Sequence, residues 1–386
     1  MIPISVLANL RSLFKGKNSE VDINSKIFKL QYRTTTTILF CLCLLITTNS
    51  LVGNPISCLY DSSISYLKED TVNTYCWIYS TFTIPRYYSH QYQASVAHPG
   101  VGTYNSKTDD VKLYHTYYQW VPFILFFQAL MFYSPHWLWK IWEGGKVQST
   151  IAGLSVPIKS NQERQKVTLG LIEYLRASHR HHDYYAKKYL FCEFLSILNC
   201  ILNILLLNKF LNGMFLDYGN KVLAYYQNDN VTTINPMTIV FPKVTKCSVP
   251  LYGASGSKEI KDLLCILALN NFNDKIFLFM WFWLIILSVL NTLNFIYHVL
   301  IFVIPHTRKI YLNRIAKDLQ TSNFFNQVGD SFFLYLVKKN VDTLTFDYLF
   351  SNLFENLHNF SIDVIEKPKE KSVFKGMGKR NVLSHI

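Results

Sequence analysis

The chain has 386 residues, of which 50% are hydrophobic and only 16% are charged. Soluble globular proteins carry about 25% charged residues, so this composition excludes a disordered chain, a collagen-like fibre and a small disulfide-rich protein, and it indicates an integral membrane protein. The formal net charge of +13 fits either a nucleic-acid-binding surface or basic residues gathered on the cytosolic side of a membrane.

Four long stretches of the sequence are almost free of charged side chains. A helix of about 20 residues crosses the hydrocarbon core of a bilayer, and each stretch reaches that length. We therefore expect four transmembrane helices, at residues 34–53, 116–139, 189–208 and 276–305. Buried core helices of a large soluble protein are the alternative, but four such runs in one chain are typical of a membrane protein.

The basic residues are distributed unevenly among the segments between the spans. Segments 1–33, 140–188 and 306–386 contain 27 Lys and Arg residues, whereas the loops 54–115 and 209–275 contain 11. By the positive-inside rule, both termini and the middle segment are cytosolic, and the two loops are extracellular. The basicity therefore reflects topology, and no nucleic-acid partner is expected. We expect a helical cytoplasmic domain that ends in a mobile basic tail able to touch anionic lipid.

Four of the eight cysteines lie in the extracellular loops, at Cys58, Cys76, Cys247 and Cys265. Cysteines on the oxidising side of a membrane predict two disulfides. Their spacing does not fit a zinc site, whose paired ligands lie about two to four residues apart. The sequence leaves three pairings open. Bridges between the loops would fix one helical hairpin to the other, whereas bridges within a loop would only tighten that loop.

Both extracellular loops carry patterns typical of ordered structure. TYCWIYSTFTIP, around Cys76, favours a strand or a packed extended segment. IVFPKVTKCSV favours a short strand bounded by prolines, and YGASGS favours a turn. The expected fold is an all-α polytopic membrane protein, with four transmembrane helices, a disulfide-stapled extracellular α/β cap and a helical cytoplasmic domain.

Apolar residues recur at three- and four-residue spacing near the N-terminus, which predicts an amphipathic helix. Its polar side carries Asn9, Arg11 and Ser12. Taken alone, such a helix fits a segment that lies on the membrane surface, beside lysines that contact lipid headgroups.

Several residues within the predicted spans have chemical consequences. Pro122 predicts a kink in the second span, because proline removes a helical hydrogen bond. Glu193, an acid within the third span, is a functional candidate, although it lies close enough to the cytosolic end to reach the interface. Outside the spans, in the predicted cytosolic segment, the HRHH sequence at residues 179–182 favours a solvated helical stretch over a metal site. Four asparagines predict hydrogen bonds between helices: Asn199, Asn203, Asn291 and Asn294.

Asn230, followed by valine and threonine, forms a predicted glycosylation site in the second extracellular loop. No nucleotide-binding, zinc-protease or serine-hydrolase motif is found in the sequence, so neither an enzymatic activity nor a cofactor is expected. The competing class is a four-span adhesion or scaffold protein whose loops bind partners without opening a pore.

Long segments of the chain resemble the innexins, the gap-junction proteins of invertebrates. The resemblance begins with YYQWVPF and LFFQALMFYSPHWLWKIWEGGK and continues through FPKVTKC, NDKIFLFMWFWLIILSVL and VGDSFFLYLVKKNVD. It covers essentially the whole chain and is greatest toward arthropod members. The chain departs from the family at Asn54 and near Ser57, where acids are usual, and at Ala254, where proline is common. Such drift would suit a specialised or virus-carried copy.

The resemblance implies a subunit of a large-pore gap-junction channel or hemichannel at plasma-membrane cell junctions. It implies a homo-oligomer, suggested to be an octamer, or a heteromer with other innexins, which docks with a second ring in an apposed membrane. It also implies that Cys58 pairs with Cys265 and Cys76 with Cys247. Each bridge closes a long loop and would stabilise the fold by about 4 kcal/mol in the chain-entropy description.

The resemblance further implies a place for the N-terminal helix inside the pore mouth. Asn9, Arg11 and Ser12 would then line the pore, with Asn54 and Ser57 at its outer end. In a wide pore, ring charge and diameter set selectivity. Because Asn54 and Ser57 are neutral, we expect a weaker cation preference than in a typical relative.

Overall fold

The computed structural model describes residues 21–59, 68–89, 96, 98–104, 110–152, 166, 169–171, 173–174, 178, 182–227, 234–253, 255–315 and 327–348. The chain divides into two units. Residues 23–145 and 184–303 form the first, which we call the membrane unit. Residues 1–22, 146–183 and 304–386 belong to the second, which we call the helical unit.

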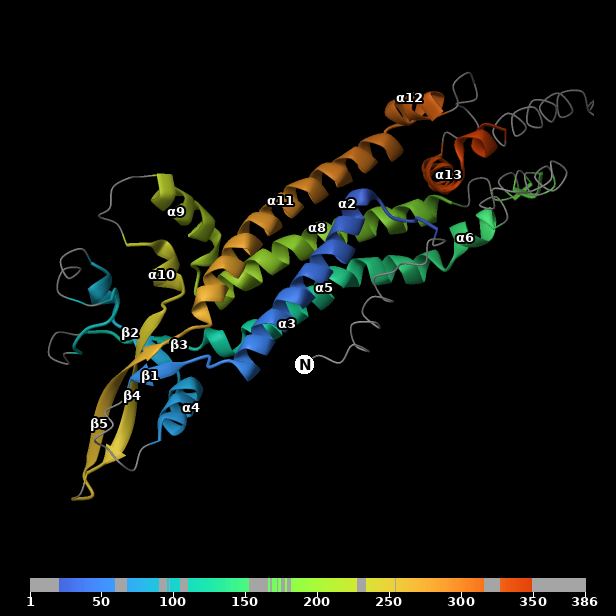
Figure 1. Ribbon diagram of the computed structural model, residues 1–386. Helices are drawn as coiled ribbons and strands as arrows, with labels where there is room; N and C mark the ends of the chain where they lie inside the picture. The colour runs from blue at the N-terminus through green and yellow to red at the C-terminus, as the bar shows by residue number, and fades with distance from the viewer. Residues whose placement is uncertain are drawn as a thin grey trace, which may run out of the picture. The chain divides into compact units, whose positions relative to one another are not determined.

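Four long helices of the membrane unit run beside one another (Figure 1). The first comprises α2 (Lys26–Lys29), the π-helical turn η1 (Leu30–Thr35) and α3 (Thr36–Val52), and it is followed by α5 (Val121–Glu143), α8 (Asp183–Phe210) and α11 (Asn270–Phe302). They contain 27, 23, 28 and 33 residues, and each is long and apolar enough to cross a membrane. The prediction of four spans is confirmed. The first, third and fourth helices begin before the predicted spans, because their polar first turns continue the same helices.

The spans share a buried core, to which each contributes large apolar side chains. Leu39, Phe132, Leu207 and Leu284 are all fully buried in it. Other apolar side chains remain exposed around the same helices, such as Phe127 and Leu293. Exposed apolar surface of this extent is unfavourable in water, so these faces suit lipid or neighbouring subunits.

The prediction of a kink at Pro122 is wrong. Pro122 lies in the first turn of α5, where the backbone N–H groups have no helical acceptor and proline removes nothing. The proline inside this helix is Pro135. The helix ends at Gly144, whose φ of 62° lies in the left-handed region that favours glycine.

A five-stranded antiparallel sheet is formed by the two loops between the spans. Its strands are β1 (Ser57–Leu59), β2 (Thr81–Thr83), β3 (Leu113–His115), β4 (Val244–Tyr252) and β5 (Lys258–Ile266), in the order β1-β5-β4-β2-β3. The first loop supplies β1, β2 and β3, and the second supplies the hairpin at the centre of the sheet. The sheet is therefore completed only when both loops are present.

Two of the predicted extended segments are only partly strands, because Thr81–Thr83 of the first forms β2 and the second contributes to β4. TYCWIY belongs to α4 (Glu69–Tyr79), whose first turn carries two acids that interact favourably with the positive end of the helix dipole. The strand predicted around IVFPKVTKCSV starts later, at Val244, because the residues before it form α10 (Pro236–Val240). This strand also continues through Pro250. The predicted turn is present between β4 and β5, where Gly253 N donates to Ser257 O.

In its described residues, the same unit contains three further elements. These are η2 (Pro85–Tyr88), η5 (Tyr117–Gln119) and α9 (Phe215–Gln227). Helix α9 packs against α11, where Trp281 Nε1 donates to Leu216 O at 2.9 Å. A Cβ atom at Gly219 would lie only 2.2 Å from the Trp281 ring, so this close packing requires glycine.

In the described residues, the helical unit contains α6 (Lys146–Ile151), α12 (Pro305–Ile315) and α13 (Val328–Asn340). His182 is buried and its Nδ1 lies 3.2 Å from Asp330 Oδ1, so the prediction of a solvated stretch is wrong at this residue. His179 and His181 lie outside the described residues. Gly329 N donates to Asp183 Oδ1 at 2.7 Å, and a Cβ atom at Gly329 would meet the His182 backbone at 2.0 Å.

Candidate functional site

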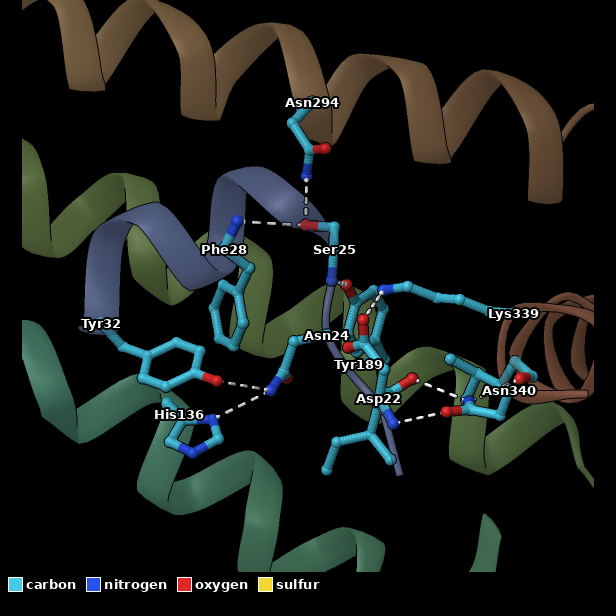
Figure 2. Close-up of polar contacts among 12 residues, drawn as sticks. Asp22, Asn24, Ser25, Phe28, Tyr32, His136, Tyr189, Asn294, Lys339 and Asn340 are labelled. Carbon is cyan, nitrogen blue, oxygen red and sulfur yellow. Dashed lines mark hydrogen bonds and ion pairs between the residues drawn. The ribbon is translucent and has the colours of Figure 1, made fainter. Parts of the chain in front are cut away.

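The three residues that lead into the first span are held by side chains from other spans (Figure 2). Asn24 Nδ2 donates to Tyr32 Oη at 3.2 Å and lies 3.3 Å from His136 Nδ1 on α5. The Tyr32 and His136 rings are stacked with their centroids 3.6 Å apart. Trp139 Nε1, also on α5, donates to Ile23 O at 3.3 Å.

Ser25 caps the start of this helix and extends the contacts to two further spans. Its Oγ accepts from Phe28 N at 3.1 Å, which satisfies a backbone donor of the first turn. Its own N–H donates to Tyr189 Oη on α8 at 3.1 Å, and Asn294 Nδ2 on α11 donates to Ser25 Oγ at 3.3 Å. We call residues 23–25 the span-entry linker, because all three other spans bind it.

A buried acid lies beside this linker. Glu193 on α8 is 3% exposed, and its carboxylate lies 2.7 Å from His298 Nδ1 on α11. It also accepts from Asn294 Nδ2 at 2.9 Å and from Ser25 Oγ at 3.4 Å. Glu193 therefore does not reach the interface but joins the span-entry linker, α8 and α11. A buried carboxyl group is tolerated when its oxygens are hydrogen-bonded in this way.

The π-helical turn of the first span carries a second buried polar cluster. Gln31 accepts from Asn291 Nδ2 at 2.7 Å and donates to Ser196 O at 3.0 Å, while Ser196 Oγ also donates to Gln31 Oε1. Thr35 accepts from Trp283 Nε1 at 3.0 Å. The irregular turn is thereby fixed to α8 and α11. Turns of this kind occur frequently at functional sites.

A third polar contact repairs the helix interrupted by Pro135. Proline lacks an N–H group, so Met131 O loses its helical donor. Asn199 Nδ2 on α8 donates to this carbonyl at 2.7 Å, and Ser134 Oγ donates to it at 2.9 Å. Asn203 donates within its own helix, to Asn199 O at 2.8 Å. The predicted contacts between helices are present at the other three asparagines and absent, in the described residues, at Asn203.

Asp22, the residue before the span-entry linker, belongs to the helical unit. Asn340 Nδ2 at the end of α13 donates to Asp22 O at 2.9 Å, and Asp22 N donates to Asn340 Oδ1. Lys339 Nζ lies 3.1 Å from the Asp22 carboxylate (Figure 2). The chain thus passes from one unit to the other at a point where the residues on both sides are bound.

Two disulfides join the loops of the cap. Cys58 is bonded to Cys265 and Cys76 to Cys247, which is the pairing that the resemblance implied. The Sγ atoms of Cys58, Cys76 and Cys265 lie within 4.8 Å of one another, but their bonding in disulfides leaves no thiolate to hold a metal. The bridges lie in a small core with Ile56, which packs the two loops together.

The remaining predicted site residues are only partly described. Asn54 and Ser57 are exposed, directly after the first span. Asn9, Arg11, Ser12 and Asn230 lie outside the described residues. Sequence reasoning singled out Glu193 but missed its partner His298, because nothing in the local sequence indicates which residue of α11 faces α8.

These features define a class: a four-span membrane protein whose two loops form one disulfide-linked cap and whose spans meet around buried polar residues. The Innexin family model matches residues 24–357. Innexin shaking-B of Drosophila melanogaster is 40% identical over 363 residues, which cover 92% of this chain and 96% of that protein. Innexin inx2 of Schistocerca americana is 39% identical over 351 residues, with coverage of 90% and 96%. The chain belongs to the innexin family, whose members are gap-junction channel subunits and not enzymes.

Proposed function

We propose that this innexin forms a ring of subunits, suggested to be eight, around a wide aqueous pore whose cytosolic mouth is lined by the N-terminal segment. The observation that carries the proposal is the fixed span-entry linker. Trp139, Tyr189 and Asn294 on the three other spans bind its backbone or side chains, so the chain enters the bundle at a defined position. An N-terminal segment that starts from a fixed point can occupy a defined place in a pore.

In the proposed topology, both termini lie in the cytosol and the disulfide-linked cap lies outside the plasma membrane, at cell junctions. The excess of Lys and Arg in segments 1–33, 140–188 and 306–386 supports this orientation. The two disulfides support it as well, because disulfides persist in an oxidising compartment. Two such rings in apposed membranes would dock through the cap, and other innexins could join the ring.

The proposed pore lining comprises Asn9, Arg11 and Ser12 at the cytosolic end and Asn54 and Ser57 at the outer end. The exposure of Asn54 and Ser57 directly after the first span supports this assignment. Neither carries a charge, so the outer mouth would favour cations less than a ring of acids does.

Asn230 is proposed to carry a glycan in the extracellular loop between the third and fourth spans. A glycan on the docking rim would favour single-membrane hemichannels, whereas a glycan at the side of the ring would leave docking unaffected. Asn230→Gln distinguishes these cases through its effect on current between cells.

Paired cells expressing the protein, measured for junctional conductance beside single-cell dye uptake, test the channel proposal. Dye uptake alone shows a hemichannel, and current between the cells shows docking. With Cys41→Ser as the parent, Ser12→Cys should make dye uptake sensitive to a charged thiol reagent, and the parent should remain insensitive. Absence of both signals from protein present at the cell surface would favour the adhesion or scaffold class.

A further inference from the structure

One strand of the cap has an open edge. Strand β5 pairs with β4 along its whole length, but β1 covers only residues 264–266 of its other edge. Residues 258–262 are exposed, and Ile260 is 65% exposed. Within the described part of the chain no other strand pairs with this edge. A long exposed edge is a template for pairing with another strand, and natural proteins usually cover it.

The backbone of this edge has a defined hydrogen-bonding direction. Leu267 N donates to Lys243 O at 2.8 Å, so odd-numbered residues of β5 bond toward β4. Residues 258, 260 and 262 therefore direct their N–H and C=O groups to the open edge. The position of Pro250 agrees with this assignment, because it lies opposite Ile260 and has no N–H group to offer.

The side chains of the same segment are complementary to themselves. Its sequence is Lys258, Glu259, Ile260, Lys261 and Asp262. When two copies pair antiparallel about Ile260, Lys258 lies opposite Asp262 and Glu259 lies opposite Lys261. The nearest other registers that keep the even-numbered residues hydrogen-bonded are shifted by two residues. They place either Glu259 opposite Glu259 or Lys261 opposite Lys261, and both arrangements repel.

We propose that β5 is the docking strand of the cap and that its partner is β5 of a second copy in an apposed membrane, paired antiparallel about Ile260. This inference rests on the proposed channel function and deepens it by naming the contact between rings. The hairpin of β4 and β5 extends beyond the ends of the spans (Figure 1). Copies in one membrane hold β5 in the same sense along the membrane normal, whereas copies in apposed membranes hold it in opposite senses. Antiparallel pairing therefore selects the apposed copy.

Asp262 already has partners within its own hairpin. Lys246 Nζ lies 2.9 Å from its carboxylate, and Ser248 Oγ donates to it at 2.6 Å. Burial favours a raised pKa for Asp262, but the hydrogen bonds from Ser248 and Lys246 and the nearby cations Lys246 and Lys112 lower its pKa overall. Asp262 is therefore charged, and Lys258 of the second copy adds a second cation beside it. The Glu259 and Lys261 pair lies on the other face of the strand and is better suited to mutation.

A charge exchange between two cells tests the docking strand. Lys261→Glu gives a strand with acids at both positions, and Glu259→Lys gives a strand with lysines at both. Each variant paired with itself should lose junctional conductance about tenfold, because two like-charge pairs arise per contact in every subunit of the ring. The acidic variant in one cell and the basic variant in the other should recover the wild-type conductance, since both pairs become attractive again.

Ile260→Pro is the second test. It removes an N–H group that faces the open edge and leaves the bonds to β4 in place, so it should abolish junctional conductance without unfolding the hairpin. Dye uptake by single cells should remain at the wild-type level in every variant. Absence of both dye uptake and junctional current in the wild-type protein would instead overturn the channel proposal.

The docking proposal fails if the acidic variant paired with itself conducts like the wild type. It also fails if mixed pairing of the acidic and basic variants does not restore conductance while dye uptake stays normal. Lys221→Glu, at an exposed lysine of α9 outside the strand, serves as the charge control and should leave junctional conductance unchanged.

Discussion

The carboxylate of Glu193 and the imidazole of His298 lie 2.7 Å apart, and each side chain is only 3% exposed. This contact joins α8 to α11 next to the span-entry linker. Breaking a buried pair by removal of one partner costs about 3 to 5 kcal/mol, because the other group remains buried without compensation.

His298→Ala should therefore lower the free energy of unfolding by about 3 kcal/mol, measured by thermal unfolding of the purified protein in detergent. Glu193→Gln added to His298→Ala should cost much less than Glu193→Gln in the wild type, because the partner has already been lost. Tyr297→Ala, at an exposed neighbouring residue, is the control. Strictly additive effects of the two substitutions would show that the pair is not coupled.

The contact between Asn199 and Met131 O should depend on Pro135. Asn199→Ala should destabilise the wild type by about 1 kcal/mol, because a buried carbonyl loses a donor. In a Pro135→Ala background the alanine N–H replaces the missing donor, so the same substitution should cost almost nothing. Unfolding of the four proteins in detergent measures the difference, with Leu198→Ala as the matched control. An equal cost of Asn199→Ala in both backgrounds would contradict the repair described above.

Four predicted spans agree with the structure because long apolar runs are a local and physical signal. The asparagines within the spans also predict contacts between helices, since a buried amide needs a hydrogen-bond partner. Composition does not show whether Pro122 or Pro135 lies inside the helix, because this depends on where the helix begins. Residues before Val121 form η5, so Pro122 falls in the first turn.

The cap was harder to predict for a different reason. TYCWIY has the aromatic and β-branched composition of a strand, yet Val72 and Cys76 lie one helical turn apart and bury one face of α4. Its disulfide partner and part of its packing surface are supplied by the other loop. The prolines around Cys247 suggested a short strand, but Pro250 is compatible with strand pairing because its missing donor faces away from β5.

The buried imidazole of His115 predicts a pH dependence for the cap. Thr83 Oγ1 lies 2.8 Å from His115 Nε2, and burial lowers the pKa of His115 to about 4. Because the folded pKa lies below the unfolded value of about 6.5, stability is complete above that pH and falls as the pH drops toward 4. The loss should reach about 2 kcal/mol at pH 5.

His115→Gln keeps a polar group beside Thr83 and removes the titration. The difference in melting temperature between pH 7.5 and pH 5 should therefore be smaller in this variant than in the wild type, measured on the purified protein. Identical pH responses in the two proteins would exclude His115 as the source.

The proposed place of Asn54 at the outer end of the pore predicts the effect of introducing an acid there. Asn54→Asp should raise the preference for cations, because one negative charge per subunit then surrounds the pore. The reversal potential of hemichannel current in a salt gradient should move toward the cation equilibrium potential, and Asn54→Gln should not move it. An unchanged reversal potential with Asp at this position would place residue 54 away from the permeation path.

The order of strands in the cap determines when the protein can be completed during synthesis. Strand β1 pairs only with β5 in the described chain, and β2 reaches the hairpin through β4. Cys58 and Cys265 are separated by 207 residues, so in the proposed topology the first loop cannot complete this bridge until at least 265 of the 386 residues have been translated. Until then Cys58 and Cys76 lack their native partners, which are both supplied by the second loop.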